Sequence, residues 1–175
     1  MFSVIFPGQG SQIIGMGKEF FEKYDLVKNL FKEADEALDL SLSKIILEGP
    51  KEKLDLTENT QPAIFLISYS IFEMVQRESN INLKKAKYFA GHSLGEYSAL
   101  TACDALDFRS GIKLLNERGK SMQTAVPKGS GGMLAVLGVE INEIQNLLED
   151  NKNSCKCYIA NDNSNGQIVL SGLNS

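Results

Sequence analysis

The sequence predicts an α/β protein with a parallel sheet, followed by the start of a smaller α+β unit. The short apolar strand at Tyr88–Ala90 leads through a tight turn directly into a helical segment, and this order is typical of parallel sheets. From Met133 onward the pattern changes to strand, helix, strand, turn and strand, and a glycine-rich stretch at 127–132 separates the two patterns. We therefore expect a large unit over residues 1–127 and a partial small unit over residues 128–175.

The first part of the chain has the pattern of a strand, a loop and amphipathic helices. Residues 2–6 form an apolar strand, and the run Gly8–Gln12 that follows is too rich in glycine for regular structure. Apolar residues then recur at three- and four-residue steps between Leu26 and Leu38, which predicts a helix. A glycine and a proline in the segment 48–50 break the helical pattern.

An almost wholly apolar helix is predicted from about Pro62 to Gln76. The polar run Asn59–Gln61 supplies caps before a proline in the first turn, which is a common helix start. Two further helices are predicted over 94–103 and 107–125, the second with Asp107 as its N-cap. The elements predicted for the small unit are strands at 133–137, 156–160 and 167–171 and a helix at 140–149.

Composition and charge exclude several classes of protein. The chain is 43% hydrophobic and 23% charged, as in an ordinary globular protein, and no apolar run approaches the ~20 residues that span a bilayer. Its net charge of −4 argues against a nucleic-acid surface. The N-terminus lacks the basic start and small-residue cleavage site of a signal peptide, so we expect a cytoplasmic protein. Cys155 and Cys157 have no second cysteine or histidine pair downstream, so we expect no metal site.

The segment 91–95, Gly-His-Ser-Leu-Gly, matches the glycine-x-serine-x-glycine pattern of a nucleophile elbow. In such a turn the serine sits in a strained conformation at a strand-to-helix corner, so the flanking positions must be small. The turn presents the serine Oγ at the end of the sheet, and the next backbone N–H points at the oxyanion that develops during acyl transfer. We therefore predict that Ser93 is the nucleophile of an acyl-transfer site; the alternative is a tight glycine turn with an idle serine.

A serine nucleophile needs a base. The chain's single histidine, His92, directly precedes Ser93, and neighbouring side chains in such a turn point in different directions, so His92 is poorly placed to take the Oγ proton. In elbow enzymes the catalytic histidine follows the serine in the chain, and none occurs between Ser93 and Ser175. Either the base is absent or it lies on sequence that this chain does not contain.

The loop Gly8–Gln12 has several interpretations. It fails as a dinucleotide fingerprint because Ile13 occupies the third glycine position, and it fails as a phosphate loop because no lysine–serine or lysine–threonine ending follows. A tight loop after the first strand can instead aim a backbone N–H at the carboxyl end of the sheet, where elbow enzymes have their second oxyanion donor. Taken alone, the loop has the pattern of a plain turn.

Arg118 shares one apolar helix face with Leu115 and Met122, at three- and four-residue spacing. A guanidinium turned toward the protein interior costs several kcal/mol unless it meets an anion. One interpretation is a buried ion pair with a protein carboxylate, for which Glu96 is a candidate. The other is a two-armed clamp for a substrate carboxylate. The residues alone favour neither interpretation.

Four motifs follow one another along the chain. They are Gly-Gln-Gly-Ser-Gln at 8–12, Thr-Gln-Pro-Ala at 60–63, Gly-His-Ser-Leu-Gly-Glu-Tyr at 91–97, and Arg118 with Met122. Together they resemble malonyl-CoA:acyl carrier protein transacylases and the related acyltransferase domains of polyketide and fatty acid synthases. The resemblance runs from residue 2 to the end of the chain, with Ala160-Asn161 and Gly166-Gln167 in family-like positions.

The resemblance implies an α/β-hydrolase-like large subdomain, incomplete here, and the start of a ferredoxin-like small subdomain. It implies transfer of a malonyl group from malonyl-CoA to the phosphopantetheine thiol of acyl carrier protein, in fatty acid biosynthesis, through a malonyl ester of Ser93. The backbone N–H groups of Gln12 and Leu94 would form the oxyanion hole. Arg118 would pair with the malonate carboxylate, and Met122 would line the pocket. The resemblance implies no permanently bound cofactor and a monomeric full-length form.

Family members continue well beyond residue 175 and supply the catalytic histidine from there, so we expect this chain to be a fragment with little turnover of its own. Asn165 stands where the family loop often has proline. Two other functions fit the elbow: a serine hydrolase acting on acyl esters or thioesters, and a non-catalytic module that binds CoA or carrier protein. A neutral ester would leave the Arg118 guanidinium without a partner, which argues against the hydrolase.

Overall fold

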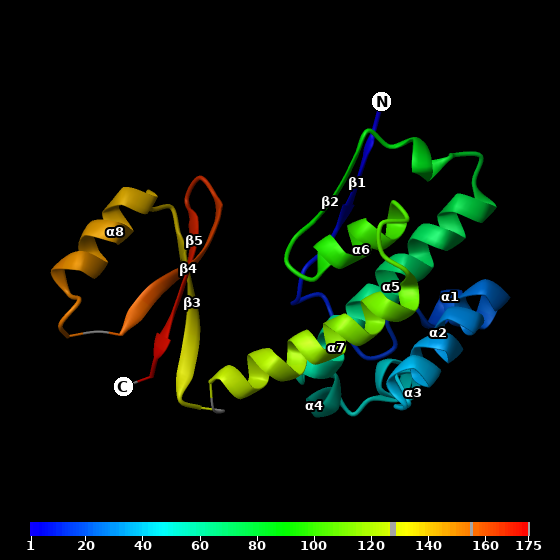
Figure 1. Ribbon diagram of the computed structural model, residues 1–175, viewed down its shortest axis with the longest axis horizontal. Helices are drawn as coiled ribbons and strands as arrows, with labels where there is room; N and C mark the ends of the chain where they lie inside the picture. The colour runs from blue at the N-terminus through cyan, green and yellow to red at the C-terminus, as the bar shows by residue number, and fades with distance from the viewer. Residues whose placement is uncertain (127–128, 155, 175) are drawn as a thin grey trace. The chain divides into compact units, whose positions relative to one another are not determined.

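The computed structural model describes residues 1–126, 129–154 and 156–174 (Figure 1). The chain folds as two compact units, Met1–Met122 and Gln123–Ser175. The boundary predicted between residues 127 and 128 lies outside the described residues, as does Cys155. Among the described residues, no helix combines the length and the apolar character needed to cross a membrane.

A parallel sheet organises the first unit. β1 (Ser3–Phe6) pairs with β2 (Tyr88–Gly91), and Phe6 lies opposite Gly91 where both strands end. α6 (Gly95–Ala102) follows β2 and contacts both strands. Because parallel strands end at the same edge of a sheet, the loop after β1 and the turn after β2 leave the sheet side by side. The predicted parallel sheet and its strand–turn–helix order are confirmed.

The remaining helices of the first unit build its main hydrophobic core. They are α1 (Lys18–Lys23), α2 (Asp25–Leu38), α3 (Leu42–Glu48), α4 (Lys51–Leu54), α5 (Thr57–Glu78) and α7 (Phe108–Ala125), with a 3₁₀ turn, η1, at Leu83–Lys85. The helix predicted between Leu26 and Leu38 is α2, and its apolar spacing buries Leu30 and Ala34 in that core. α5 and α6 also contact the sheet, since Phe72 and Ala99 share a cluster with Phe6.

The start of α5 differs from the prediction. The helix begins at Thr57, so Pro62 lies inside it and the polar run before the proline is helical and buried. Pro62 has no N–H, which leaves the Glu58 carbonyl without its partner in the helix. The Asn116 Nδ2 of α7 donates to that carbonyl at 2.9 Å. The proline therefore creates an acceptor that ties α5 to α7.

The side chains of Asn59 and Thr60 were predicted to be helix caps, and they bond elsewhere. The Asn59 Nδ2 donates to the Lys53 carbonyl at 2.9 Å, and the Thr60 Oγ1 donates to the Leu54 carbonyl at 2.5 Å. Both acceptors lie on α4, which has too few residues to satisfy its own last carbonyls. The Thr60 Oγ1 also lies 3.1 Å from the Leu56 carbonyl at the start of α5, so these buried polar groups find partners both on the neighbouring helix and on their own.

α7 follows the prediction, including its N-cap. The Asp107 carboxylate accepts a hydrogen bond from the Ser110 backbone N–H at 2.9 Å. Hydrogen bonds from Ser110 lower the pKa of the Asp107 carboxyl below its ordinary value. Farther along α7, Gly119 faces α5 so closely that a Cβ there would lie 2.4 Å from the Glu58 Cα. The two helices approach backbone to backbone at this point.

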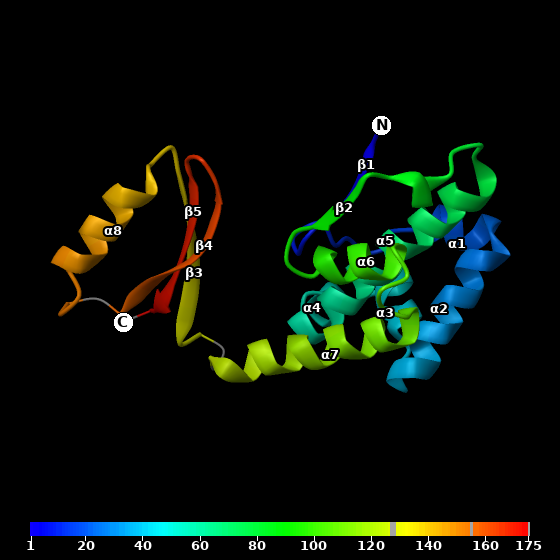
Figure 2. The same ribbon diagram turned by 45° about the horizontal axis from the view of Figure 1, so that its top comes forward.

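The second unit has the elements that the sequence predicted. They are β3 (Gly131–Leu137), α8 (Ile141–Asp150), β4 (Cys157–Ser164) and β5 (Gln167–Leu173). The strands form an antiparallel sheet in the order β3-β5-β4 (Figure 2). α8 covers one face of this sheet, and its Ile144 packs against Ile168 and Leu170.

Candidate active site

Ser93 occupies the turn between β2 and α6 in a strained conformation. Its φ is 55°, in the left-handed region that residues other than glycine rarely adopt, at a cost of about 1–3 kcal/mol. The flanking glycines make the turn possible, because a Cβ on Gly91 would lie 2.0 Å from the Gly95 carbonyl carbon. A Cβ on Gly95 would lie 2.6 Å from the Phe6 carbonyl oxygen of β1. This is the backbone geometry that the elbow pattern predicts.

The Arg118 side chain contacts Ser93 directly. One guanidinium arm, Nη2, donates to the Ser93 Oγ at 3.1 Å, and the other, Nη1, donates to the Gln61 Oε1 at 2.5 Å. No carboxylate in the described ranges lies within 4.0 Å of the guanidinium, so the ion pair with Glu96 is not formed. The half-buried cation is therefore held beside the serine without being neutralised.

Gln61 is a site residue that the sequence reasoning missed. Its side chain is fully buried, at 0% exposure, and its amide bonds to Arg118 through Oε1 and to the Met122 Sδ through Nε2, at 3.2 Å. Its place in the Thr-Gln-Pro-Ala motif was interpreted only as a helix start. A polar amide at the start of an almost wholly apolar helical run indicates that a buried partner is needed, but it does not identify that partner.

Met122, which the resemblance expects to line the pocket, is only partly buried. The side chain is 48% exposed. Met122 still contacts the buried site through the hydrogen bond from Gln61 to its sulfur.

The loop after β1 is anchored by the Gln12 side chain. The Gln12 Oε1 accepts from the Gly10 N–H at 3.0 Å, and its Nε2 donates to the Asp55 Oδ1 at 3.2 Å. Hydrogen bonds from Lys51 and then from Gln12 lower the pKa of the Asp55 carboxyl. Among the described residues, no acceptor engages the backbone N–H of Gln12 or that of Leu94. The Leu94 residue is buried at 0% exposure, whereas Gln12 lies partly exposed on its loop.

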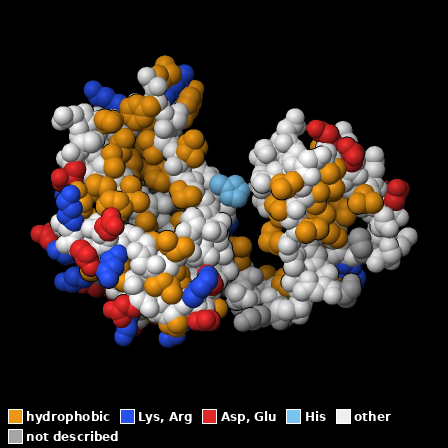
Figure 3. Space-filling view, turned by 180° about the vertical axis from the view of Figure 1, so that it is seen from behind, with side chains coloured by type: hydrophobic (Ala, Val, Ile, Leu, Met, Phe, Trp, Pro, Cys, Tyr) orange, Lys and Arg blue, Asp and Glu red, His pale blue; other side chains and the backbone are white. Residues whose placement is uncertain are grey.

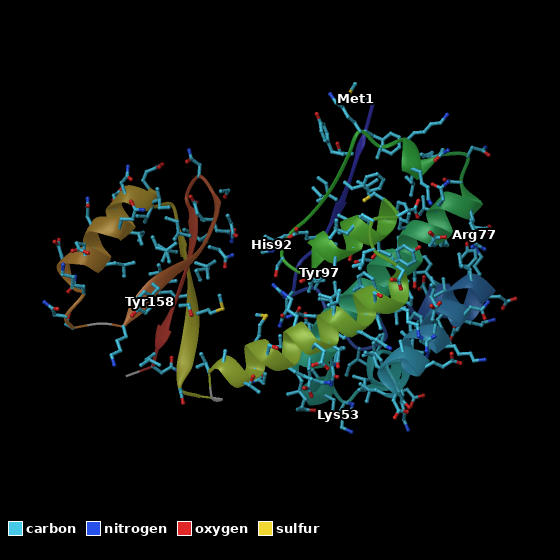
Figure 4. The ribbon with its side chains drawn as sticks, viewed as in Figure 1. Met1, Lys53, Arg77, His92, Tyr97 and Tyr158 are labelled. Carbon is cyan, nitrogen blue, oxygen red and sulfur yellow. The ribbon has the colours of Figure 1, made fainter. Side chains whose placement is uncertain are left out.

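His92 connects the two loops at the sheet edge. Its backbone N–H donates to the Phe6 carbonyl at 3.3 Å, and a Cβ on Gly8 would lie 2.6 Å from its Nδ1, so the imidazole sits against the β1 loop. Figure 3 shows the imidazole at the surface, and Figure 4 places it at the turn that leaves β2. The described residues contain no group of three or more His, Cys, Asp or Glu side chains that could hold a metal ion.

A strained serine at a strand-to-helix corner with a cation beside it is the arrangement expected of the nucleophile-elbow class. Residues 3–175 match the family described as the acyl transferase domain, and the chain belongs to this family. It is 45% identical over 169 residues to the malonyl CoA-acyl carrier protein transacylase of Bacillus subtilis, covering 96% of this chain and 52% of that protein. The chain spans about half the length of the curated relatives it matches.

Solved structures of relatives have the same fold. An acyl-carrier-protein-S-malonyltransferase from Bartonella henselae superposes with a TM-score of 0.91 at 42% identity, covering 99% of this chain and 55% of that one. A malonyl-transacylase in complex with the acyl carrier protein of a type II PKS gives a TM-score of 0.88 at 36% identity, again covering 99% and 55%. The predicted fold class, with its parallel-sheet large part and the start of the small one, is confirmed.

Proposed function

We propose that this chain is the nucleophile-bearing part of a malonyl-CoA:acyl carrier protein transacylase that acts in fatty acid biosynthesis. The relatives bear this activity in their names, and the chain shares 36–45% identity with those quoted. Malonyl-CoA is the substrate, acyl carrier protein is the partner, and no cofactor stays bound. The protein works as a cytoplasmic monomer without nucleic acid or membrane, in line with its net charge of −4.

The first half-reaction loads the serine. The Ser93 Oγ attacks the thioester carbonyl of malonyl-CoA while a base takes its proton, and the oxyanion is bound by the backbone N–H groups of Gln12 and Leu94. The C–S bond then breaks, the CoA sulfur leaves with a proton, and a malonyl ester of Ser93 remains. In the second half-reaction the phosphopantetheine thiol gives its proton to the base and its sulfur attacks the ester carbonyl. The bond from that carbonyl to the Ser93 oxygen breaks, the base returns the proton to this oxygen, and the malonyl group leaves as a thioester of the carrier.

The base is assigned by family resemblance to a histidine outside residues 1–175, because His92 sits against the β1 loop and next to the nucleophile. A histidine in that role takes the Oγ proton and returns it to the leaving sulfur. The two units correspond in this proposal to the large and small subdomains of the family, with the boundary near residue 127.

The observation that carries the proposal is the un-neutralised guanidinium beside the nucleophile. One methylene group separates the free carboxylate of a malonyl group from the carbonyl that Ser93 attacks, so a cation 3.1 Å from the Oγ is within reach of it. A neutral acyl ester offers no such anion, and burying a guanidinium without one is unfavourable. The arrangement therefore favours a diacid substrate over the ester of a serine hydrolase.

Radiolabelled malonyl-CoA tests the proposal in a chimaera that continues residues 1–175 into the second half of the Bacillus subtilis relative. We expect a covalent malonyl adduct on Ser93, located by mass spectrometry, and passage of the label to the thiol of acyl carrier protein. Ser93→Ala should abolish the adduct, whereas Ser98→Ala, buried on α6, should keep it. Rapid release of free malonate without passage to the carrier would instead identify a hydrolase.

A further inference from the structure

The Gln61 amide holds one arm of the Arg118 guanidinium while the other arm faces the nucleophile. We propose that Gln61 is a positioning residue that gives this site its preference for acyl groups with a free carboxylate. It does so by fixing the guanidinium without cancelling its charge. This inference rests on the proposed function and adds the residue that makes Arg118 an effective anion receptor.

Gln61 is itself held in place by three contacts between helices. Thr60, its neighbour, is anchored to α4 through the Leu54 carbonyl. The Glu58 carbonyl one turn earlier in α5 is bonded to Asn116 of α7, at 2.9 Å. Gly119 of α7 meets the same turn of α5 backbone to backbone. The segment of α5 that carries Gln61 is therefore fixed relative to the segment of α7 that carries Arg118.

The chemical type of the residue matters as much as its position. Buried arginines are usually paired with a carboxylate, which neutralises them and removes their attraction for a second anion. A carboxamide oxygen accepts the same hydrogen bond but carries no net charge. With Gln61 in this place, the full positive charge of Arg118 stays available to a substrate. A glutamate of the same shape would form an ion pair with the guanidinium and neutralise its charge.

The orientation of the amide follows from its two partners. The guanidinium has only donors, so it must face Oε1, and the Nε2 is then turned toward the Met122 Sδ, 3.2 Å away. Thioether sulfur is a weak acceptor that tolerates this donor without competing for the arginine. Met122 thus completes the surroundings of Gln61 rather than binding the carboxylate itself.

The first test measures positioning alone, in residues 1–175, by NMR of the arginine side chains. A guanidinium held by hydrogen bonds rotates slowly and gives separate ¹⁵Nη signals, so we expect two for Arg118. Gln61→Met keeps the volume but removes the acceptor, and the two signals should merge. Gln61→Glu keeps the acceptor, and the signals should stay apart. Gln76→Met, on the same helix but bonded to the Leu83 N–H, should leave the Arg118 signals unchanged.

The second test compares the affinities of the same proteins for malonyl-CoA and acetyl-CoA by calorimetry, in a Ser93→Ala background that prevents acyl transfer. The wild-type sequence at position 61 should favour malonyl-CoA, and both Gln61→Glu and Gln61→Met should reduce the ratio at least about tenfold. If Gln61 served only the structure, its replacement would weaken the binding of malonyl-CoA and acetyl-CoA alike and leave the ratio of the two affinities unchanged. Thermal melts show whether Gln61→Glu and Gln61→Met are folded. One folded variant of these two is enough to decide whether Gln61 sets the preference for malonyl-CoA.

The outcomes separate this inference from the proposed function. No preference for malonyl-CoA with glutamine at position 61 would overturn the proposed function. A clear preference that survives in Gln61→Glu or Gln61→Met would overturn the role of Gln61 while the proposed function stands. A single averaged ¹⁵Nη signal for Arg118 in the protein with Gln61 would show that Gln61 does not hold the guanidinium in place.

Discussion

At the scale of single residues, Ser93 is defined by what surrounds it. Its φ of 55° is tolerated because glycines on both sides let the turn close and let α6 approach β1. Its Oγ accepts a hydrogen bond from Arg118, so the nucleophile and the proposed anion receptor are in contact before any substrate arrives. A malonyl carboxylate must therefore compete with the serine hydroxyl for one guanidinium arm, and its charge favours it in that competition.

Arg118→Ala should change which acyl group is transferred. Hydrogen bonds to a charged group contribute about 1.5–3 kcal/mol, so kcat/KM for malonyl-CoA should fall about 10- to 100-fold. Acetyl transfer, which needs no cation, should fall much less. The measurement is the ratio of the two kcat/KM values in a catalytically competent protein that contains this chain. Equal losses for both substrates would mean that the arginine serves only the structure.

The local geometry of single residues was predictable where a sequence pattern carries it. The elbow pattern located Ser93, and helical spacing placed Arg118 toward the interior. Gln61 was missed because its partner lies on another helix, and no local pattern reports how two helices pack. For the same reason the helical spacing did not report that Met122 would be 48% exposed or that its sulfur would meet Gln61 of α5.

At the scale of elements, α7 is the helix that brings Arg118 to the site, and Gly119 sets its distance from α5. Gly119→Ala would raise helix propensity, yet the added Cβ would lie 2.4 Å from the Glu58 Cα, which cannot yield as a side chain does. We expect a loss of about 1–3 kcal/mol in the free energy of unfolding, measured with denaturant. Lys113→Ala, on the exposed face of α7, should change it by less than about 0.5 kcal/mol.

The N-cap of α7 predicts a dependence of stability on pH. The folded-state pKa of Asp107 lies below its ordinary value of 3.8, so its contribution is present above that pH and is lost as the pH falls through the folded-state pKa. Asp107→Ala should lower the melting temperature at pH 7, and the difference from wild type should shrink on acidification. Asp107→Asn keeps an acceptor without the titrating proton. A difference between wild type and Asp107→Ala that is constant with pH would contradict this assignment.

Element types were predictable from periodicity, but the start of α5 was not. The proline rule assumes that a helix interior loses a hydrogen bond at proline, and here Asn116 replaces the lost partner of the Glu58 carbonyl. The polar residues before Pro62 looked like caps because their tertiary acceptors on α4 are invisible in the sequence. The parallel sheet was inferred correctly from the strand–turn–helix order, whereas the pairing of β1 with β2 was not predicted.

At the scale of the whole molecule, every described part of the candidate site belongs to the unit Met1–Met122. The only histidine in the sequence is His92, so residues 1–175 should show little turnover of malonyl-CoA on their own. Loss of triad function typically lowers kcat by several orders of magnitude, and label transfer over hours would measure it. Brisk turnover by these residues would show that His92 or another group acts as the base.

The register of β1 against β2 sets the distance between the two donors of the proposed oxyanion hole. One donor follows β1 and the other follows β2, and the alignment of Phe6 with Gly91 sets the starting point of both loops. A slip by a single residue would displace one amide by about 3.3 Å, more than the length of a hydrogen bond allows. Oxyanion binding at such a site therefore tolerates no error in strand register, because only the correct register lets both N–H groups point at the same oxygen atom.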